Sequence, residues 1–122
     1  DGRTRLGVLT DLGHVFDGLD DILAGLDAVL LESNYDPHML EQCWYPWAVK
    51  QRISGWGGHL ANAESAELLA RSGRRLRWAC LAHLSADTNH PRLALETHAE
   101  VLGGALPLHV AGRHAPTAML EI

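Results

Sequence analysis

The sequence has little of what marks disulfide-rich, secreted or membrane-spanning proteins. Its two cysteines, Cys43 and Cys80, lie far apart and form no CxxC pair, so no disulfide framework is indicated. Cys80 lies in the apolar run WACLAHL and is predicted to be a buried free thiol, which favours a cytoplasmic location. No apolar run approaches the length of a membrane span, and no secretory signal is visible.

Positive charge is also scarce. The sequence has ten Lys and Arg residues and fifteen Asp and Glu residues, which gives a net charge of −5. This balance argues against an autonomous, strongly basic nucleic-acid-binding protein. A local arginine cluster, Arg71, Arg74, Arg75 and Arg77, is best explained as a solvated loop edge. The 122 residues are 47% hydrophobic and 20% charged, which is typical of one globular domain or a piece of one.

No methionine begins the sequence, which opens with DGRTRLGVL almost directly in an expected strand. Such a start is typical of the interior of a longer protein. We therefore expect this chain to be part of a domain.

The apolar patterning predicts an α/β protein. Short apolar runs bounded by polar residues predict strands at 5–12, 27–33, 75–85, 106–111 and 117–122. Helical spacing and capping residues predict helices at 18–26, 36–43, 45–53, 63–72 and 91–103, with Asp36 and Asn62 as caps. A turn, GRHAPT, is expected between the last two strands. Alternation of helices with evenly apolar strands predicts a sheet covered by helices.

Three polar clusters fall at predicted strand ends or in a glycine-rich loop: TDLGH (10–14), GGHLAN (57–62) and AHLS (82–85). In sheets flanked by helices, such ends form the functional rim. A carboxylate and imidazoles converging there suit a divalent metal such as zinc, which can activate water for hydrolysis. The spacing is not specific, because HExxH, HxH and paired CxxC motifs are absent, and most of the eight histidines are expected to be structural or surface residues.

The ordered string of segments is more specific. GVLTDLGHV, DAVLLESNYDPHML, YPWAVKQRISGWGGHLAN and LAHLSADTNHPRLA resemble the C-terminal half of metallo-β-lactamase-fold metallohydrolases, especially the YycJ-type group of phosphodiesterase and exonuclease-like proteins. The family pattern runs T-D-x-G, E-x-N-H-D-x-x-M-L, Y-P-x-x-L-K-x-R-I, G-H-L-S-N and L-A-H-L-S. The resemblance extends from about Gly7 to Ala94, with order and approximate spacing kept.

The resemblance implies roles for three residues of these motifs. Asp11 matches the aspartate that bridges two metal ions, and His83 matches the late histidine ligand. His59 matches a histidine near the metal centre, for which we expect a role in catalysis, either proton transfer or contact with the substrate phosphate.

Other matched positions are expected around that centre. Asn34, Lys50 and Arg52 are expected to contact substrate, with a solvated helix face as the alternative for the last two. His14 and Asp36 are expected beside the metal ligands rather than on the ions.

The chain also departs from the family pattern. Tyr35 stands where the pattern has histidine, and Ala61 stands where it has serine. The HxHxDH motif that supplies most metal ligands is absent, as is the single histidine that precedes the T-D-x-G strand. Asp11 and His83 cannot complete a dinuclear site alone, because each zinc needs about three protein ligands. Residues 1–122 are therefore expected to form a single, partial domain that lacks the N-terminal half.

The resemblance thus implies a hydrolase of phosphodiester bonds, of the phosphodiesterase or nuclease type, that uses two zinc ions, or manganese, to activate water. Its expected partners are a phosphodiester or nucleic-acid substrate and the missing N-terminal half or a second copy, without a membrane. The resemblance implies that the chain forms the C-terminal half of an αββα sandwich. The alternative function is a non-catalytic fragment or interaction module with a degenerate metal site, since half of such a sandwich exposes an apolar sheet face and edge.

Overall fold

The computed structural model describes residues 3–112 and 117–122. Within them the chain forms one four-stranded sheet in the order β1-β2-β3-β4, and every neighbouring pair of strands is parallel. The elements are β1 (Leu6–Leu9), α1 (Leu19–Ala24), β2 (Ala28–Glu32), α2 (Pro37–Gln42), α3 (Trp47–Ser54), α4 (Asn62–Ser72), β3 (Trp78–Ala82), α5 (Pro91–Leu102) and β4 (Leu108–Val110). The predicted α/β class is confirmed.

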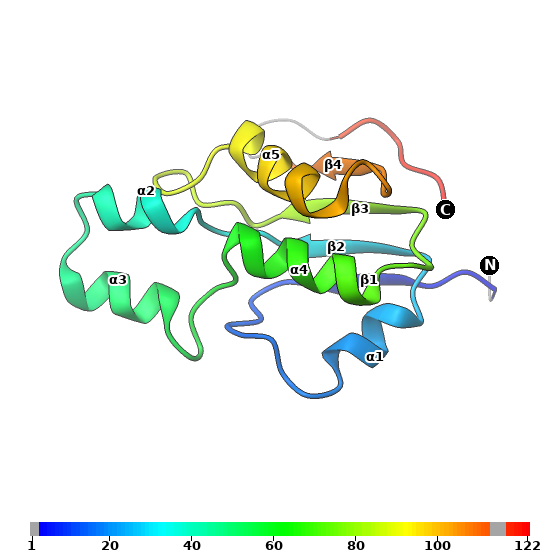
Figure 1. Cartoon of the computed structure of the whole chain (residues 1–122), viewed down its shortest axis with the longest axis horizontal. Coiled ribbons are helices and arrows are strands. Elements are labelled where there is room, and N and C mark those ends of the chain that lie inside the picture. Colours follow the sequence, from blue (N-terminus) through cyan, green and yellow to red (C-terminus); the bar gives the residue numbers. More distant parts are fainter. Residues whose placement is uncertain (1–2, 113–116) are drawn as a thin grey trace.

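One face of the sheet carries the main core. Side chains alternate between faces along each strand, so Val29 and Leu31 of β2 point to the same side as Ala79 and Leu81 of β3, and all four are fully buried. Helices α1, α4 and α5 cover this side, and α4 and α5 lie in front of the sheet in Figure 1. Burial of this apolar surface is the main source of stability.

The opposite face of the sheet is only partly covered. Trp78 and Cys80 pack there against Leu120 of the C-terminal segment, and the indole N–H of Trp78 donates to the carbonyl of Glu121 at 2.8 Å. Leu6 and Val8 of β1 lie on the same side and are 51% and 61% exposed. Apolar side chains therefore face solvent at one end of this surface.

Helices α2 and α3 project beyond the carboxyl ends of the strands, at the left of Figure 1. Pro37 begins α2, and the carboxylate of Asp36 caps it by accepting the Met39 N–H at 2.9 Å, as predicted from the Asp-Pro pair. This placement brings α2, α3 and the loop after α3 to the edge of the sheet where the polar clusters lie.

The predicted helices and the first four strands are confirmed, most of them with shorter bounds, although α3 ends one residue later and α4 begins one residue earlier than predicted. The strand expected at 117–122 is wrong, since that segment has no regular structure and covers Trp78 instead. Of the expected GRHAPT turn, residues 113–116 lie outside the described residues. Asn62 was expected to cap the fourth helix, but the cap is Ala61, because the side chain of Asn62 is buried in a polar network.

Both cysteines are free thiols, and Cys80 is buried; burial raises the pKa of its thiol. Within the described ranges, no helix combines the length and apolar character needed to cross a membrane.

Candidate metal site

Four metal-binding side chains meet at the carboxyl edge of the sheet. Asp11 follows β1, Glu32 ends β2, and His83 follows β3, while His59 comes from the loop between α3 and α4. One donor atom from each residue lies within 4.8 Å of the others. Parallel strands end at a common edge, which is why residues so distant in sequence converge here.

Glu32 is the centre of this group. It is fully buried, and its Oε1 accepts hydrogen bonds from Nδ1 of His59 at 2.8 Å and from Nδ1 of His83 at 2.9 Å. Its Oε2 accepts the backbone N–H groups of Leu12 at 3.2 Å and Leu60 at 3.3 Å. Every lone-pair direction of the carboxylate is thus directed at a donor, which offsets the cost of burying a charge.

The hydrogen bonds to Glu32 also favour the ionised form of its carboxyl group. Burial raises the pKa of its carboxyl, but the hydrogen bonds from His83, His59 and the Leu60 N–H together outweigh burial, so the pKa lies below its ordinary value. A carboxylate that accepts Nδ1–H from two imidazoles leaves the Nε2 atom of each ring available to another group.

Asp11 and His83 are the exposed members of the group. Their side chains are 73% and 46% exposed, and Oδ1 of Asp11 lies 3.4 Å from Nδ1 of His83. Both residues have positive φ angles, 57° and 60°, which are uncommon outside glycine. Aspartate and histidine adopt this conformation more often than most other residues, and here both residues lie just beyond the ends of their strands.

Asn34 holds the backbone of His83. Its Nδ2 donates to the carbonyl oxygen of His83 at 2.6 Å, and its own backbone bonds to Leu60 and Ser85. Because Asn34 is nearly buried, this contact fixes the strand end that presents the His83 ring.

A buried network of polar side chains lies next to the same edge of the sheet. The side-chain oxygen of Asn62 accepts from Ser33 at 2.5 Å and from Asn89 at 2.9 Å, and Asn89 also donates to the carbonyl of Ser33. These residues join the end of β2, the start of α4 and the loop before α5. A satisfied network of this kind restricts the segments to one arrangement.

The loops that carry Asp11 and His59 pack directly on each other. Gly13 has φ +69°, and a Cβ built on it would lie 2.8 Å from the Cα of Gly57, so only glycine fits this approach. Beside it the His14 ring stacks on the indole of Trp56, with ring centroids 3.5 Å apart and an interplanar angle of 19°.

The structure brings together three of the residues predicted for the site: Asp11, His83 and His59. His14 lies outside the group of four donors and stacks on Trp56. Asp36 caps α2. On α3, Nζ of Lys50 donates to the carbonyl of Glu41 at 2.6 Å, and Arg52 is exposed in the last turn. The roles assigned to all of these residues stay predictions.

Sequence reasoning missed Glu32, although a signal was present. The acid ends the otherwise apolar strand AVLLE, in a sheet that the sequence predicts to be covered by helices. A carboxylate in such a strand needs charged or hydrogen-bonding partners, and histidines in the neighbouring clusters were the available ones.

Tyr35, at the position where the family pattern has histidine, is not among the four donors. It is 4% exposed and packs with Leu40 and Ala61. Burial, with the nearby charge of Glu64, raises the pKa of its phenol to about 12. The side chain therefore stays neutral and apolar in character at this position.

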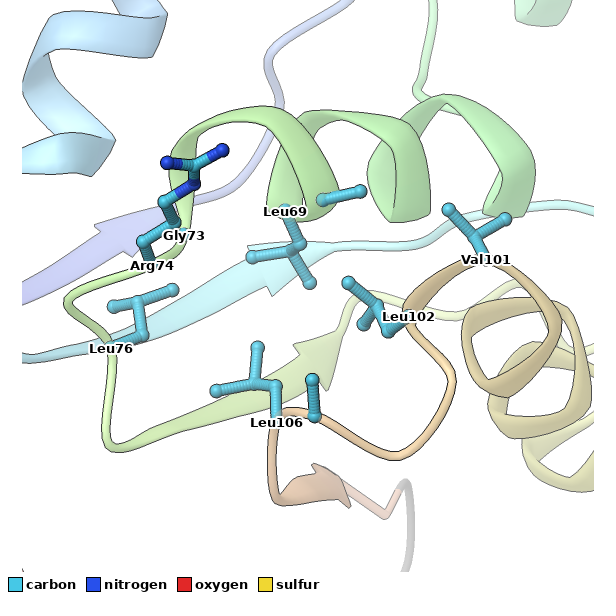
Figure 2. A pocket seen from close by; sticks show the side chains of 9 residues that line it. Leu69, Gly73, Arg74, Leu76, Val101, Leu102 and Leu106 are labelled. Atoms are coloured by element: carbon cyan, nitrogen blue, oxygen red, sulfur yellow. The ribbon is translucent and has the colours of Figure 1, made fainter.

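A hollow of about 380 Å³ adjoins the donors and is lined by His59, His83, Asn34, Tyr45 and Asp87, among others. A second hollow, of about 340 Å³, lies between the C-terminal ends of α4 and α5 (Figure 2). Its lining is mostly apolar and includes four leucines, with Arg74 of the arginine cluster beside them. The second hollow is at the opposite edge of the sheet and contains none of the four donors.

The parallel sheet with helices packed on it, and the polar group at its carboxyl edge, agree with part of a metallo-β-lactamase-like fold. The chain is 34% identical to the exodeoxyribonuclease YycJ of Bacillus anthracis, over 93% of this chain and 46% of that protein. It is 38% identical to the exodeoxyribonuclease WalJ of two Streptococcus pneumoniae strains, over 80% of this chain and 37% of those proteins. The resemblance to YycJ-type proteins of the metallo-β-lactamase fold, in their C-terminal half, is therefore confirmed.

The chain spans less than half the length of these curated relatives. No family model matches the chain, and no solved structure matches it.

Proposed function

We propose that this chain contributes part of the active site of a metal-dependent nuclease or related phosphodiesterase. The observation that carries the proposal is the convergence of Asp11, His59 and His83 on the buried carboxylate of Glu32 at the carboxyl edge of the sheet. The relatives named as exodeoxyribonucleases support DNA as the substrate.

The donor set fits a divalent metal ion. It consists of imidazole nitrogens and carboxylate oxygens, the ligands that zinc takes in hydrolytic sites, and manganese accepts them too. Asp11 and His83 would hold the ions, with Asp11 as the bridge if two are bound. Glu32 would orient His83 by occupying Nδ1, an arrangement common behind metal-binding histidines. Bound there, the metal would activate water and stabilise negative charge on the phosphate.

His59 would act as the proton donor or as a contact for the substrate phosphate. Its side chain is 31% exposed, and its Nδ1 bonds to Glu32, so Nε2 is the atom able to reach a ligand. The hydrogen bond to Glu32 holds the ring in one orientation, which suits His59 to delivering a proton to a leaving oxygen. Asn34, Lys50 and Arg52 are further candidates for contacts with the substrate.

We also propose that residues 1–122 are one part of a larger metallo-β-lactamase-fold domain, whose other half supplies an HxHxDH motif. Two observations support this. The two exposed ligands fall short of the roughly three protein ligands that each zinc requires. Leu6 and Val8 are more than half exposed on the sheet face that helices of the described residues leave open, as expected of a face that pairs with a second sheet.

The open face equally favours a second candidate, a non-catalytic interaction module with a degenerate metal site. This module would dock through the sheet face of Leu6 and Val8, either to the missing half or to a second copy. The four donors would then be a remnant of an ancestral metal site and would have no catalytic role.

Metal analysis by mass spectrometry tests the proposal. Asp11→Ala and His83→Ala should remove bound zinc or manganese from the chain, whereas His38→Ala, an exposed histidine on α2, should not. In parallel, hydrolysis of an end-labelled DNA strand is measured with the chain alone and after adding an HxHxDH-containing N-terminal half.

Metal binding lost in both variants, with hydrolysis that depends on the added half, would support a shared active site. A chain that binds no metal under either condition and never supports hydrolysis would overturn the nuclease proposal in favour of the interaction module.

A further inference from the structure

The residues that follow Glu32 are joined by backbone hydrogen bonds to the residues that follow His59. The Asn34 N–H donates to the carbonyl of Leu60 at 2.9 Å, and the Asn62 N–H donates to the carbonyl next to Asn34 in the chain, also at 2.9 Å. A parallel bridge joins the same two segments. The two segments therefore run side by side in one direction from the candidate site.

The register of these two segments places the His59 ring. Nδ1 of His59 lies 2.8 Å from Oε1 of Glu32, and the next N–H along the chain, that of Leu60, donates to Oε2. A slip of one residue would move the loop by about 3.3 Å along β2, which exceeds the range of a hydrogen bond. Whatever fixes the register therefore also keeps His59 on Glu32.

Helix α3 cannot fix the register by itself. The N–H of His59 donates to the carbonyl of Ile53, near the end of α3, at 2.9 Å. No residue of α3 is buried, however, so this helix is not anchored in the core. The end of β2 is the fixed reference for the loop, because β2 lies between two other strands of the sheet.

The side chain of Asn62 ties the loop to the end of β2. Its Oδ1 accepts from the hydroxyl of Ser33 at 2.5 Å, and its Nδ2 donates to Oδ1 of Asn89 at 2.9 Å. Asn89 donates in return to Oδ1 of Asn62 and to the carbonyl of Ser33, at 2.9 Å each. All three residues are buried, so these contacts lie inside the chain and do not depend on its surface.

We propose that Asn62 is a positioning residue for His59. By bonding to Ser33 and Asn89 it fixes the loop against β2, which keeps Nδ1 of His59 on Glu32 and leaves Nε2 for a ligand. This inference rests on the proposed function, which assigns His59 to proton transfer or contact with the substrate phosphate.

The role of Asn62 is confined to one of the two imidazoles on Glu32. His83 follows β3 directly, and its carbonyl accepts from the amide of Asn34 at 2.6 Å. The backbone that presents the His83 ring is thus held without Asn62. Loss of the Asn62 amide should release His59 and leave His83 in place.

Nuclear magnetic resonance of the ¹⁵N-histidine-labelled full chain tests this difference. The spectra are recorded with chelator at about pH 8, where free imidazole is neutral, and they report which ring nitrogen carries the proton. In the unchanged chain, His59 and His83 should both carry it on Nδ1. In Asn62→Ala, the His59 proton should exchange with water at least about tenfold faster, as expected for a lost hydrogen bond, and should occupy both nitrogens, whereas His83 should be unaltered.

Two further variants accompany Asn62→Ala. Ser33→Ala removes one bond of the same network and should alter His59 in the same direction to a smaller extent. Ser65→Ala is the matched control, because Ser65 is also buried on α4 but its hydroxyl lies 3.2 Å from Nε2 of His98 instead. It should leave the His59 and His83 signals unchanged.

The inference is overturned if His59 keeps its signals in folded Asn62→Ala and Ser33→Ala, if both rings change together, or if Ser65→Ala has the same effect. Failure of both network variants to fold would assign the network to stability rather than to His59, and would overturn it too.

Because the spectra need no metal, these failures are distinguishable from failure of the nuclease proposal. Loss of metal and hydrolysis in Asp11→Ala, with an unaltered His59 ring in Asn62→Ala, would reject the positioning role alone. Selective release of His59 in a chain that never binds metal would reject the nuclease proposal alone.

Discussion

At the scale of the residue, one buried carboxylate organises the candidate site. Glu32 contacts the rings of His59 and His83 through one oxygen, and the backbone of Leu12 and Leu60 through the other. A single side chain thereby joins β2 to all three polar loops. Removal of the Glu32 charge should therefore disturb the orientation of the His59 and His83 rings more than it disturbs the fold.

Glu32→Gln replaces the carboxylate by an amide of nearly the same size. The amide cannot accept from both imidazoles and both backbone N–H groups, so the rings lose their fixed orientation. We expect zinc affinity to fall about 10- to 100-fold, the usual effect of changing a partner behind a metal ligand. Competition with a chromophoric chelator measures the affinity, with Glu67→Gln on the exposed side of α4 as the control. Equal affinities of the two variants would contradict this role of Glu32.

His98 is a second buried titratable group, within the contact between α4 and α5. Its ring is fully buried, with Nδ1 2.8 Å from the carbonyl of Ala94 and Nε2 3.2 Å from Oγ of Ser65. Burial lowers its pKa, and the hydrogen bond to Ala94 only partly offsets this, so the pKa lies below the ordinary value of 6.5. The folded chain thus holds this histidine neutral where the unfolded chain protonates it.

The free energy of unfolding should therefore fall as the pH drops below about 6.5, because the unfolded state then binds a proton that the folded state excludes. For one group the slope approaches about 1.4 kcal/mol per pH unit. Urea unfolding between pH 7.5 and 5.5 measures it. His98→Gln should flatten this dependence, whereas His38→Gln, at an exposed position, should leave it unchanged; equal slopes in both variants would refute the assignment.

At the scale of the element, the positions at which β1 and β3 end determine where Asp11 and His83 lie. β1 ends at Leu9 and β3 at Ala82, and the chain then turns through left-handed residues, Asp11 and His83, that direct side chains toward Glu32. The loop after β1 packs directly on the loop between α3 and α4, because glycines at 13 and 57 let the two backbones touch.

Gly13→Ala tests that contact. Alanine at a left-handed position costs about 1–2 kcal/mol by itself, and the added methyl group would also meet the backbone of Gly57. Gly103→Ala is the matched control, because Gly103 has a similar φ of +62° and nothing near its absent Cβ. We expect Gly13→Ala to be less stable than Gly103→Ala by at least about 1 kcal/mol in urea unfolding. Equal destabilisation would mean that the loops separate freely.

At the scale of the whole molecule, the two faces of the sheet differ in their contribution to stability. Leu31 is fully buried beneath the helices, whereas Val8 is 61% exposed on the other side. Leu31→Ala should lower the free energy of unfolding by about 2–5 kcal/mol through lost burial and a cavity.

Val8→Ala should change the stability of this chain by no more than about 0.5 kcal/mol, as surface substitutions do. Urea unfolding of both variants, monitored by circular dichroism, makes the comparison. A large loss in Val8→Ala would show that the open face is covered in solution, and sedimentation would then reveal whether a second copy covers it.

The fold was largely predictable because the periodicity of apolar residues is a local property. Four strands and five helices follow from runs such as DAVLLES and from caps such as Asp36 with Pro37. The segment 117–122 misled the prediction because an apolar run has the same pattern whether it pairs as a strand or covers Trp78 as irregular chain. Asn62 was wrongly predicted to cap α4, because asparagine is a common capping residue, whereas here its side chain is buried and bonds to Asn89.

The sequence alone determined the α/β class, the three polar clusters and the resemblance to YycJ-type proteins, since these depend on residue type, order and spacing. Only the tertiary structure decided that Glu32 joins His59 and His83, that His14 stacks on Trp56, and that the C-terminal segment covers part of the second sheet face. Those features depend on distances between segments up to 51 residues apart. Such distances are fixed by strand pairing and packing, which no local pattern encodes.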